Sequence, residues 1–205
     1  VICLCVGSSP FISVTHSPTA PSSSSSVTSI PYTSAAYVRS GRTSAAGFLL
    51  QGLEKLEYRG YDSAGVALIC GNKIGRCRTS GRISALEKEL SNKKPCGIVG
   101  VGHTRWATHG SPTIENAHPH VSNDGKFSIV HNGIIENAED IKKTLLKEDG
   151  HFVSDTDTEV FAHLLEKYYK GEPVSAIANA CAVLKGSYAF GILCKDFPGN
   201  IFGAA

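Results

Sequence analysis

The sequence predicts an α/β domain that begins near residue 43 and runs to residue 205. Apolar side chains recur at the spacing of amphipathic helices in several segments, and short apolar or alternating runs of strand length lie between them. Helix and strand patterns alternate along the chain, which is typical of this fold class. At ~150 residues per domain, the 205 residues correspond to about one domain with room for a tail.

The first half of the domain supplies four expected elements. Leucines and Phe48 recur at helical spacing in Ser44–Tyr58, and Ile83–Leu90 has the pattern of a short amphipathic helix. Gly65–Cys70 is an apolar run of strand length. Gly97–Val101 is a second such run, and it leads directly into a polar stretch.

The second half continues the alternation. We expect a helix over Asp157–Tyr169 with a capping box, in which Thr156 is the N-cap and Glu159 reaches back. The other expected elements are strands at Phe127–Val130 and Ser187–Cys194 and helices at Glu136–Lys147 and Pro173–Leu184.

Residues 1–42 differ in composition from the rest of the chain. They are rich in Ser, Thr, Pro and Ala, include the run Ser22–Ser26, and contain no acidic residue. Such a segment cannot support a packed core, so we expect a disordered extension. It also resembles an organelle transit peptide; a linker or an incorrectly assigned gene start is the alternative. Because the chain has no methionine, we expect a fragment or a processed product.

Composition argues against several classes of function. Lys and Arg number 20 against 18 Asp and Glu, so nothing electrostatic favours nucleic acid or an anionic membrane as partner. No apolar run approaches the ~18 residues of a membrane span. Seven cysteines without a CxxC pair form neither a disulfide framework nor a zinc-ribbon pattern. We therefore expect a reducing compartment, the cytoplasm, or a plastid or other organelle if residues 1–42 are a transit peptide.

Polar segments at strand ends and helix starts are the candidate functional loops. The guanidinium of Arg105 is a planar fork suited to a carboxylate, with the single tryptophan, Trp106, beside it; a structural ion pair is the alternative. Asn132-Gly133 is either a hairpin turn or an oxyanion hole, with the turn favoured by local sequence. Asp157 either meets the helix dipole or binds a substrate ammonium.

Histidines raise a rival hypothesis. Five of the eight fall between His103 and His131, and His118-Pro119-His120 would place two imidazoles on one face of a strand, as in some metal hydrolases. Against a metal site, the sequence has no HExxH, and Asp124 is the only acid between Glu115 and Glu136. We expect no metal, and insensitivity to a chelator would exclude the hypothesis.

Taken together, the polar segments resemble one family, the glutaminase domains of the glutamine:fructose-6-phosphate aminotransferases. The aminotransferases are also called glucosamine-6-phosphate synthases, and their glutaminase domains are class II glutamine amidotransferases. The sequence motifs RGYDSAG and HTRWATHG distinguish this family from the amidotransferases that make phosphoribosylamine, asparagine or glutamate. The resemblance runs from about Thr43 to Ala205, where the domain is still incomplete, and the two isomerase domains that follow in the family are absent. Its runs are Leu56–Gly65, His103–Gly110, Asn116–His120, His131–Asn137 and Ser154–Val160.

The resemblance implies an N-terminal-nucleophile fold of four layers, two antiparallel sheets packed face to face between helical layers. It implies hydrolysis of glutamine to glutamate and ammonia, which serves to convert fructose 6-phosphate into glucosamine 6-phosphate in the full-length enzyme. An N-terminal cysteine attacks the amide and its own α-amine is the base. No cofactor is implied, and the full-length protein would be a homo-oligomer.

Carried over to this chain, the resemblance assigns roles to particular residues. Arg105 would bind the α-carboxylate of glutamine, with Thr108 and His109 lining the same pocket, and Asp157 would hold the α-ammonium. Asn132 and Gly133 would form the oxyanion hole, overturning the turn interpretation; Trp106 would shield the site, and Arg59, Tyr61 and Asp62 would support it.

The nucleophile departs from the family pattern. The family's N-terminal Cys-Gly-Ile-Val-Gly would fall at Ser34, which is not a cysteine. Cys96–Gly100 spells the motif, but it lies nine residues before Arg105 and inside an expected strand. Cys3–Gly7 matches at three of five positions and leaves Cys3 as the remaining candidate, after removal of two residues. The alternative is a glutamine-binding module that lacks its nucleophile and does not turn over.

Overall fold

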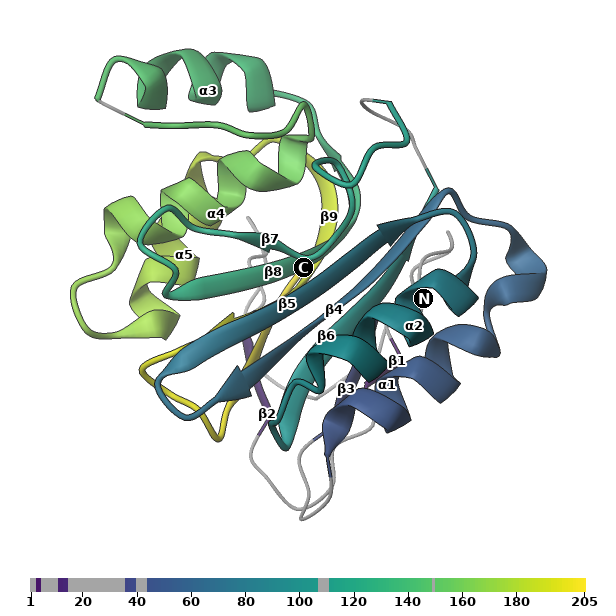
Figure 1. Cartoon of the computed structure of the whole chain (residues 1–205). Coiled ribbons are helices and arrows are strands. Elements are labelled where there is room, and N and C mark those ends of the chain that lie inside the picture. The colour runs from purple at the N-terminus through teal and green to yellow at the C-terminus, as the bar shows by residue number, and fades with distance from the viewer. Residues whose placement is uncertain (1–2, 5–10, 15–35, 40–43, 107–110, 149) are drawn as a thin grey trace, which may run out of the picture.

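Two five-stranded sheets lie face to face, and helices cover the outer face of each (Figure 1). The computed structural model describes residues 3–4, 11–14, 36–39, 44–106, 111–148 and 150–205, with backbone only for the first three ranges and Arg59. Neighbouring strands are antiparallel except for one parallel pair at an edge of each sheet. The expected four-layer arrangement is thus confirmed.

The strands are longer and more numerous than the sequence patterns predict. The hairpin partner at Lys73–Ser80 and the strand at Ile201–Ala204 were not expected, because polar residues interrupt the first and the second is short. The first sheet has the order β1 (Cys3–Leu4), β3 (Ala36–Arg39), β6 (Val99–Arg105), β4 (Ser63–Cys70), β5 (Lys73–Ser80). The second has the order β2 (Phe11–Val14), β10 (Ile201–Ala204), β9 (Gly186–Cys194), β8 (Phe127–Ile135), β7 (His120–Val121).

Three of these strands, β1, β2 and β3, fall within the segment expected to be an extension. Each pairs with a neighbour in one of the two sheets. The division of the chain at residue 42 stays a prediction.

The expected helices are present, with one interruption. The pattern over Ser44–Tyr58 forms α1 (Ala45–Glu54) and then a separate 3₁₀ turn, η1 (Glu57–Arg59), which ends at Gly60 with φ +74°. Helices α1 and α2 (Ile83–Lys93) cover the first sheet. Helices α4 (Asp157–Tyr168) and α5 (Pro173–Val183) cover the second, and α3 (Ala138–Leu146) packs against α4.

Three apolar clusters fill the three interfaces between the four layers. Strand β4 shows how one strand serves two of them: Val66 and Leu68 face α1 and α2, whereas Ala67 and Ile69 face the second sheet. Because successive side chains point to opposite faces, a strand buried on both sides is apolar at every position. This explains why the sequence shows an unbroken apolar run here.

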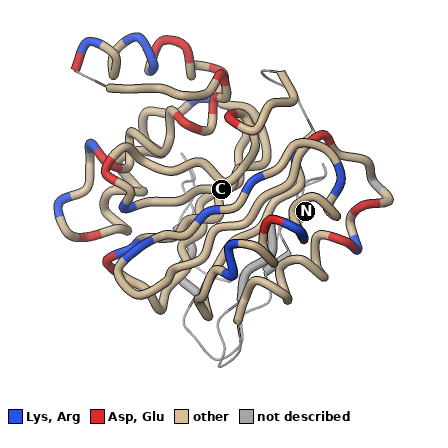
Figure 2. Tube along the Cα trace, viewed as in Figure 1, with Lys and Arg blue, Asp and Glu red and all other residues tan. Residues whose placement is uncertain are grey.

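Charged residues of both signs are dispersed along the chain. Figure 2 shows lysine and arginine interleaved with acidic residues, as along α3, where Glu139 and Asp140 precede Lys143. Among the residues that the structure describes, no helix is long and apolar enough to cross a bilayer.

Gly65 is required where the polypeptide is packed between the sheets. A Cβ atom at this position would overlap the carbonyl oxygen of His118 and lie 2.9 Å from the carbonyl oxygen of Cys77. We predict that Gly65→Ala lowers the free energy of unfolding by about 1–3 kcal/mol or more, because backbone rather than a flexible side chain must move. Urea unfolding followed by circular dichroism measures the change.

Gly47→Ala is the matched control for this substitution. Gly47 is exposed in α1, and a Cβ atom there would meet nothing within 4 Å. Alanine in a helix is favoured over glycine by roughly 0.5–1 kcal/mol, so this variant should be slightly more stable than the parent. Equal stability of the two variants would contradict the role assigned to Gly65.

Candidate active site

The layer between the two sheets changes from apolar to polar along its length. On β6, Val99 and Val101 belong to the apolar inter-sheet cluster, and the period of two places His103 and Arg105 on the same face. On β8, Val130 is in that cluster and Asn132 shares its face. The polar residues predicted at strand ends therefore meet in one place, where the apolar packing stops.

Arg105 is nearly buried, with 5% of its side chain exposed. Its Nη1 lies 3.4 Å from Oδ1 of Asp62 and donates to the carbonyl of Ser111 at 3.3 Å. The backbone N–H of Asp62 in turn donates to the carbonyl of Arg105 at 2.8 Å. The ion pair considered from the sequence is thus present.

The other residues expected to line or support the pocket of Arg105 lie in different places. Trp106 follows β6 with 62% of its surface exposed and packs over Gly60, where a Cβ atom would lie 2.7 Å from its ring. Thr108 and His109 lie outside the described residues. Tyr61 accepts from the backbone N–H of Ile83 at 2.6 Å, which ties the turn after η1 to the start of α2.

Asn132 and Gly133 lie within β8, paired with Ala189 and Tyr188 of β9, so the hairpin-turn interpretation is wrong. Gly133 has φ +127°, and a Cβ atom there would overlap the carbonyl oxygen of Ser187. Only glycine satisfies both conditions. The side-chain oxygen of Asn132 faces His103 across the sheets, with Nε2 and Oδ1 2.9 Å apart.

Asp157 is the first residue of α4, with 11% of its side chain exposed. Its Oδ2 accepts from the backbone N–H of Ile135 at 2.8 Å, and its Oδ1 lies 3.7 Å from Nδ1 of His131. Strand β8 therefore holds this carboxylate near Asn132 through the backbone of its own last residue. A carboxylate at a helix N-terminus is also favoured by the helix dipole.

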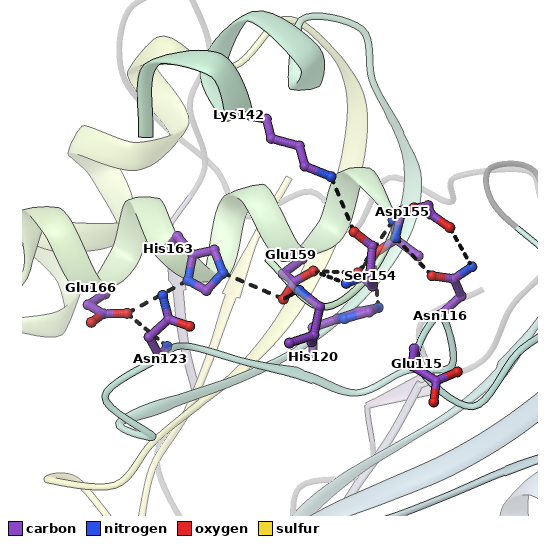
Figure 3. Close-up of polar contacts among 12 residues, drawn as sticks. Glu115, Asn116, His120, Asn123, Lys142, Ser154, Asp155, Glu159, His163 and Glu166 are labelled. Atoms are coloured by element: carbon purple, nitrogen blue, oxygen red, sulfur yellow. Dashed lines mark hydrogen bonds and ion pairs between the residues drawn. The ribbon is translucent and has the colours of Figure 1, made fainter. Parts of the chain in front are cut away.

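Asn116 joins the loop that follows β6 to the loop before Asp157, a connection that the sequence did not predict; Figure 3 shows its contacts with Asp155. Its Oδ1 accepts from the backbone N–H of Asp155 at 2.9 Å, and its Nδ2 donates to the carbonyl of Ser111 at 3.0 Å. That carbonyl also accepts from Arg105. Asn116 is 1% exposed, so this bridge is shielded from water.

The hydrogen bonds at the start of α4 differ from those of the predicted capping box. Thr156 is the N-cap residue, but its side chain makes no capping bond. Glu159 instead accepts from the backbone N–H groups of Val153 and Ser154 at 3.0 and 2.7 Å (Figure 3). Burial acts to raise the pKa of Glu159, but hydrogen bonds from His163, Ser154 and those backbone groups together lower it to about 2. A charged carboxylate thus holds the loop that leads to Asp157.

The buried histidines bind threonines at the start of α4. His118 Nε2 and His131 Nδ1 each lie 2.9 Å from Oγ1 of Thr158, and His120 Nε2 lies 3.0 Å from Oγ1 of Thr156. Within the described ranges, no group of three or more histidine, cysteine, aspartate or glutamate side chains is arranged to hold a metal ion. The histidine cluster therefore has a hydrogen-bonding role in the described structure.

Burial keeps several of these imidazoles neutral. It lowers the pKa of His103 to about 4 and that of His120 to about 3, and it lowers the pKa of His118 well below the usual value of 6.5. The positive charge of Arg78 acts in the same direction on His120. At neutral pH His103, His118 and His120 are uncharged.

The two candidate cysteines lie at different places. Cys96 is exposed and precedes β6 at the end opposite Arg105, and the strand is roughly 20 Å long. Cys3 is in β1, where its backbone pairs with Tyr37, which in turn pairs with Gly102 of β6. Cys3 is therefore level with the polar end of the inter-sheet layer, two strands away from β6.

Comparison with known proteins defines the class first. Residues 103–199 match the family described as "Glutamine amidotransferase domain". A glutamine phosphoribosylpyrophosphate amidotransferase from B. subtilis has a similar structure, with a TM-score of 0.67 and 30% identity over 78% of this chain and 35% of that one. The matched region is thus a glutamine amidotransferase domain with the N-terminal-nucleophile fold.

Its curated relatives are more specific. The chain is 48% identical over 161 residues to glutamine–fructose-6-phosphate aminotransferase [isomerizing] of Clostridium tetani, covering 78% of this chain and 26% of the relative. It is 49% identical over 163 residues to the protein of that name from Aquifex aeolicus, covering 80% and 28%. These similarities confirm the resemblance to the glutaminase domain, and the chain spans about a quarter of the length of these relatives.

The neutral histidines predict a loss of stability in mild acid. Their pKa values are lower in the folded than in the unfolded chain, so the unfolded chain binds more protons as the pH falls below about 6.5. We predict that the free energy of unfolding falls as the pH is lowered from 6.5 to 5, with a slope that approaches about 1.4 kcal/mol per pH unit for each such histidine. Urea titrations at both pH values measure it.

Two controls distinguish the contribution of these histidines to the pH dependence from that of carboxylates and of exposed groups. Glu159, with a pKa of about 2, keeps its charge throughout this window and cannot cause the loss. His120→Gln should reduce the pH dependence, whereas replacement of the exposed His151 by Gln should not. A pH dependence that is unchanged in His120→Gln would contradict the assignment.

Proposed function

We propose that the chain hydrolyses glutamine to glutamate and ammonia. The observation that carries the proposal is the set of hydrogen bonds by which Asn116 joins the carbonyl that binds Arg105 to the loop before Asp157, while Asp157 is bonded to the backbone of β8, the strand that carries Asn132. A guanidinium and a carboxylate held in this way suit the α-carboxylate and the α-ammonium of an amino acid. The matched family and the names of the relatives support the same substrate.

In the proposed reaction, a cysteine thiolate attacks the side-chain amide carbon of glutamine. Negative charge develops on the amide oxygen, where the side-chain N–H of Asn132 and the backbone N–H of Gly133 stabilise it. Ammonia leaves, a thioester remains, and water then releases glutamate. Thr108, His109 and Trp106 would line the pocket, while Arg59, Tyr61 and Asp62 support it.

The place of β1 supports Cys3 as the nucleophile. It lies level with Gly102, next to the polar end of the inter-sheet layer. Its α-amine is free to act as base only if the two residues before it are removed. A cysteine outside this sequence is the other source of a nucleophile.

The activity of the whole protein is a further part of the proposal. The relatives' names describe transfer of nitrogen to fructose 6-phosphate. We infer that the ammonia serves this transfer on isomerase domains outside this chain, in a homo-oligomer located in the cytoplasm, or in a plastid or other organelle if residues 1–42 are a transit peptide. The glutaminase step requires no cofactor.

The second candidate function is glutamine binding without turnover. It is favoured by Ser34, which stands where the family has its cysteine, and by the position of Cys96 away from the site. Intact mass and terminal sequencing of the mature protein from its native cell distinguish the two. An N-terminal cysteine supports hydrolysis, and an N-terminus within the serine-rich segment without one supports binding alone.

We predict that Arg105→Ala weakens glutamine binding by about 2–5 kcal/mol, because the substrate carboxylate loses its charged partner in a shielded site. Calorimetric titration measures the affinity. Arg105→Lys keeps the charge but not the planar fork and should bind with intermediate affinity. The exposed Arg82→Ala is the control, and unchanged affinity in Arg105→Ala would refute the carboxylate assignment.

Asn132→Ala should act on turnover. We predict that kcat for glutamate release falls ~100-fold or more while KM changes little, because an oxyanion donor acts mainly in the transition state. The exposed Asn123→Ala is the matched control. An equal loss of binding and turnover would instead indicate that Asn132 supports the fold of β8.

A further inference from the structure

We propose that His103 is a positioning residue that fixes the side-chain amide of Asn132, so that the amide N–H, and not the amide oxygen, faces the reacting carbonyl of the substrate. The inference rests on the proposed oxyanion role of Asn132. It assigns a task to a buried histidine on the opposite sheet that the glutaminase chemistry leaves unused.

The contact joins the two sheets at the polar end of the layer between them. His103 is on β6 and Asn132 is on β8, with Nε2 and Oδ1 2.9 Å apart. His103 is 2% exposed, whereas Asn132 is half-buried. Asn132 is therefore only partly enclosed, whereas the imidazole that it contacts is shielded from water.

Hydrogen-bond chemistry then selects the orientation. The side-chain oxygen of Asn132 only accepts, so Nε2 of His103 must carry the proton. Burial lowers the pKa of His103 to about 4, which keeps the imidazole neutral with one N–H to donate. Its Nδ1 makes no hydrogen bond to the residues that the structure describes, in keeping with the tautomer protonated at Nε2.

The imidazole is itself held in place. The ring of His118 lies against it with centroids 4.3 Å apart, and Nε2 of His118 is 2.9 Å from Oγ1 of Thr158. The backbone of His118 reaches this position because Gly65 has no side chain. The N–H donor of His103 is therefore held in a fixed position, and rotation of the Asn132 amide would break the hydrogen bond between them.

The wrong orientation would oppose the reaction. A rotated amide places its oxygen, which carries partial negative charge, where the substrate oxygen becomes negative. Loss of one oxyanion donor costs about 10²–10³ in kcat. Fixing the amide before the substrate arrives avoids reorganisation during the reaction, which is how such donors act.

A double-mutant cycle on the mature chain tests the inference. His103→Phe removes the donor and keeps a ring of similar shape; we expect kcat to fall about 10- to 100-fold with KM within about twofold. In an Asn132→Ala background the same change should have little further effect, because the two residues act as a unit. His103→Gln, which retains an N–H donor, should restore part of kcat.

His120→Phe is the comparison in the same cycle. It removes another buried imidazole, whose Nε2 contacts Thr156. Its effect should be the same with and without Asn132→Ala. If His103→Phe also lowers kcat by equal factors in both backgrounds, His103 has a structural role and the inference is overturned.

NMR of ¹⁵N-labelled protein provides a test that does not depend on turnover. The nitrogen resonances of His103 should show the tautomer protonated at Nε2, and the shift of the Asn132 side-chain amide on addition of glutamine should differ between the parent and His103→Phe. A tautomer protonated at Nδ1, or equal shifts in both proteins, overturns the inference. A parent chain that releases no glutamate refutes the proposed hydrolysis, and these measurements alone then decide the role of His103.

Discussion

The packing of the two sheets against each other is the constraint on which the rest of the structure depends. The strands of each sheet present one face to the opposite sheet, and that face is apolar only along part of its length. Along the same faces, Val101 is followed by His103 and Val130 is followed by Asn132. There His103 and Asn132, which belong to different sheets, contact each other as polar partners. The candidate site is thus the end of a core, which explains why its charged and neutral polar groups are so well shielded.

Close approach of backbone segments sets the geometry of this region. Gly65 admits the backbone of His118 between the sheets, and Gly133 admits the carbonyl of Ser187 from the next strand. The side chain of Asn116 then connects two loops by hydrogen bonds to their backbones. These contacts involve segments far apart in sequence, so the relative placement of Arg105 and Asp157 depends on the whole sandwich rather than on either loop.

The electrostatics of the region follow from the same burial. Groups that the structure pairs remain charged, as Arg105 does beside Asp62 and Glu159 does among four donors. Burial holds His103, His118 and His120 neutral beside them. An uncharged cluster between charged groups is suited to orienting them, because neutral N–H and hydroxyl donors bind without adding repulsion.

The sequence by itself predicted the helices, several of the strands and, through the family resemblance, the four layers and the candidate site residues. The apolar run at β4 and the helical spacing in α1 and α4 are local patterns, and such patterns predict elements. The polar segments around Arg105, Asn132 and Asp157 were local patterns too, but they left a structural and a functional interpretation open. Only the tertiary structure decided which of these meet. It moved Asn132-Gly133 from a turn into the middle of β8, redirected Glu159 from a helix cap to the preceding loop, and gave Asn116 and His103 partners on other elements. The reason is physical: strand pairing and sheet packing are long-range contacts, and a hydrogen bond between distant residues leaves no periodic trace in the sequence.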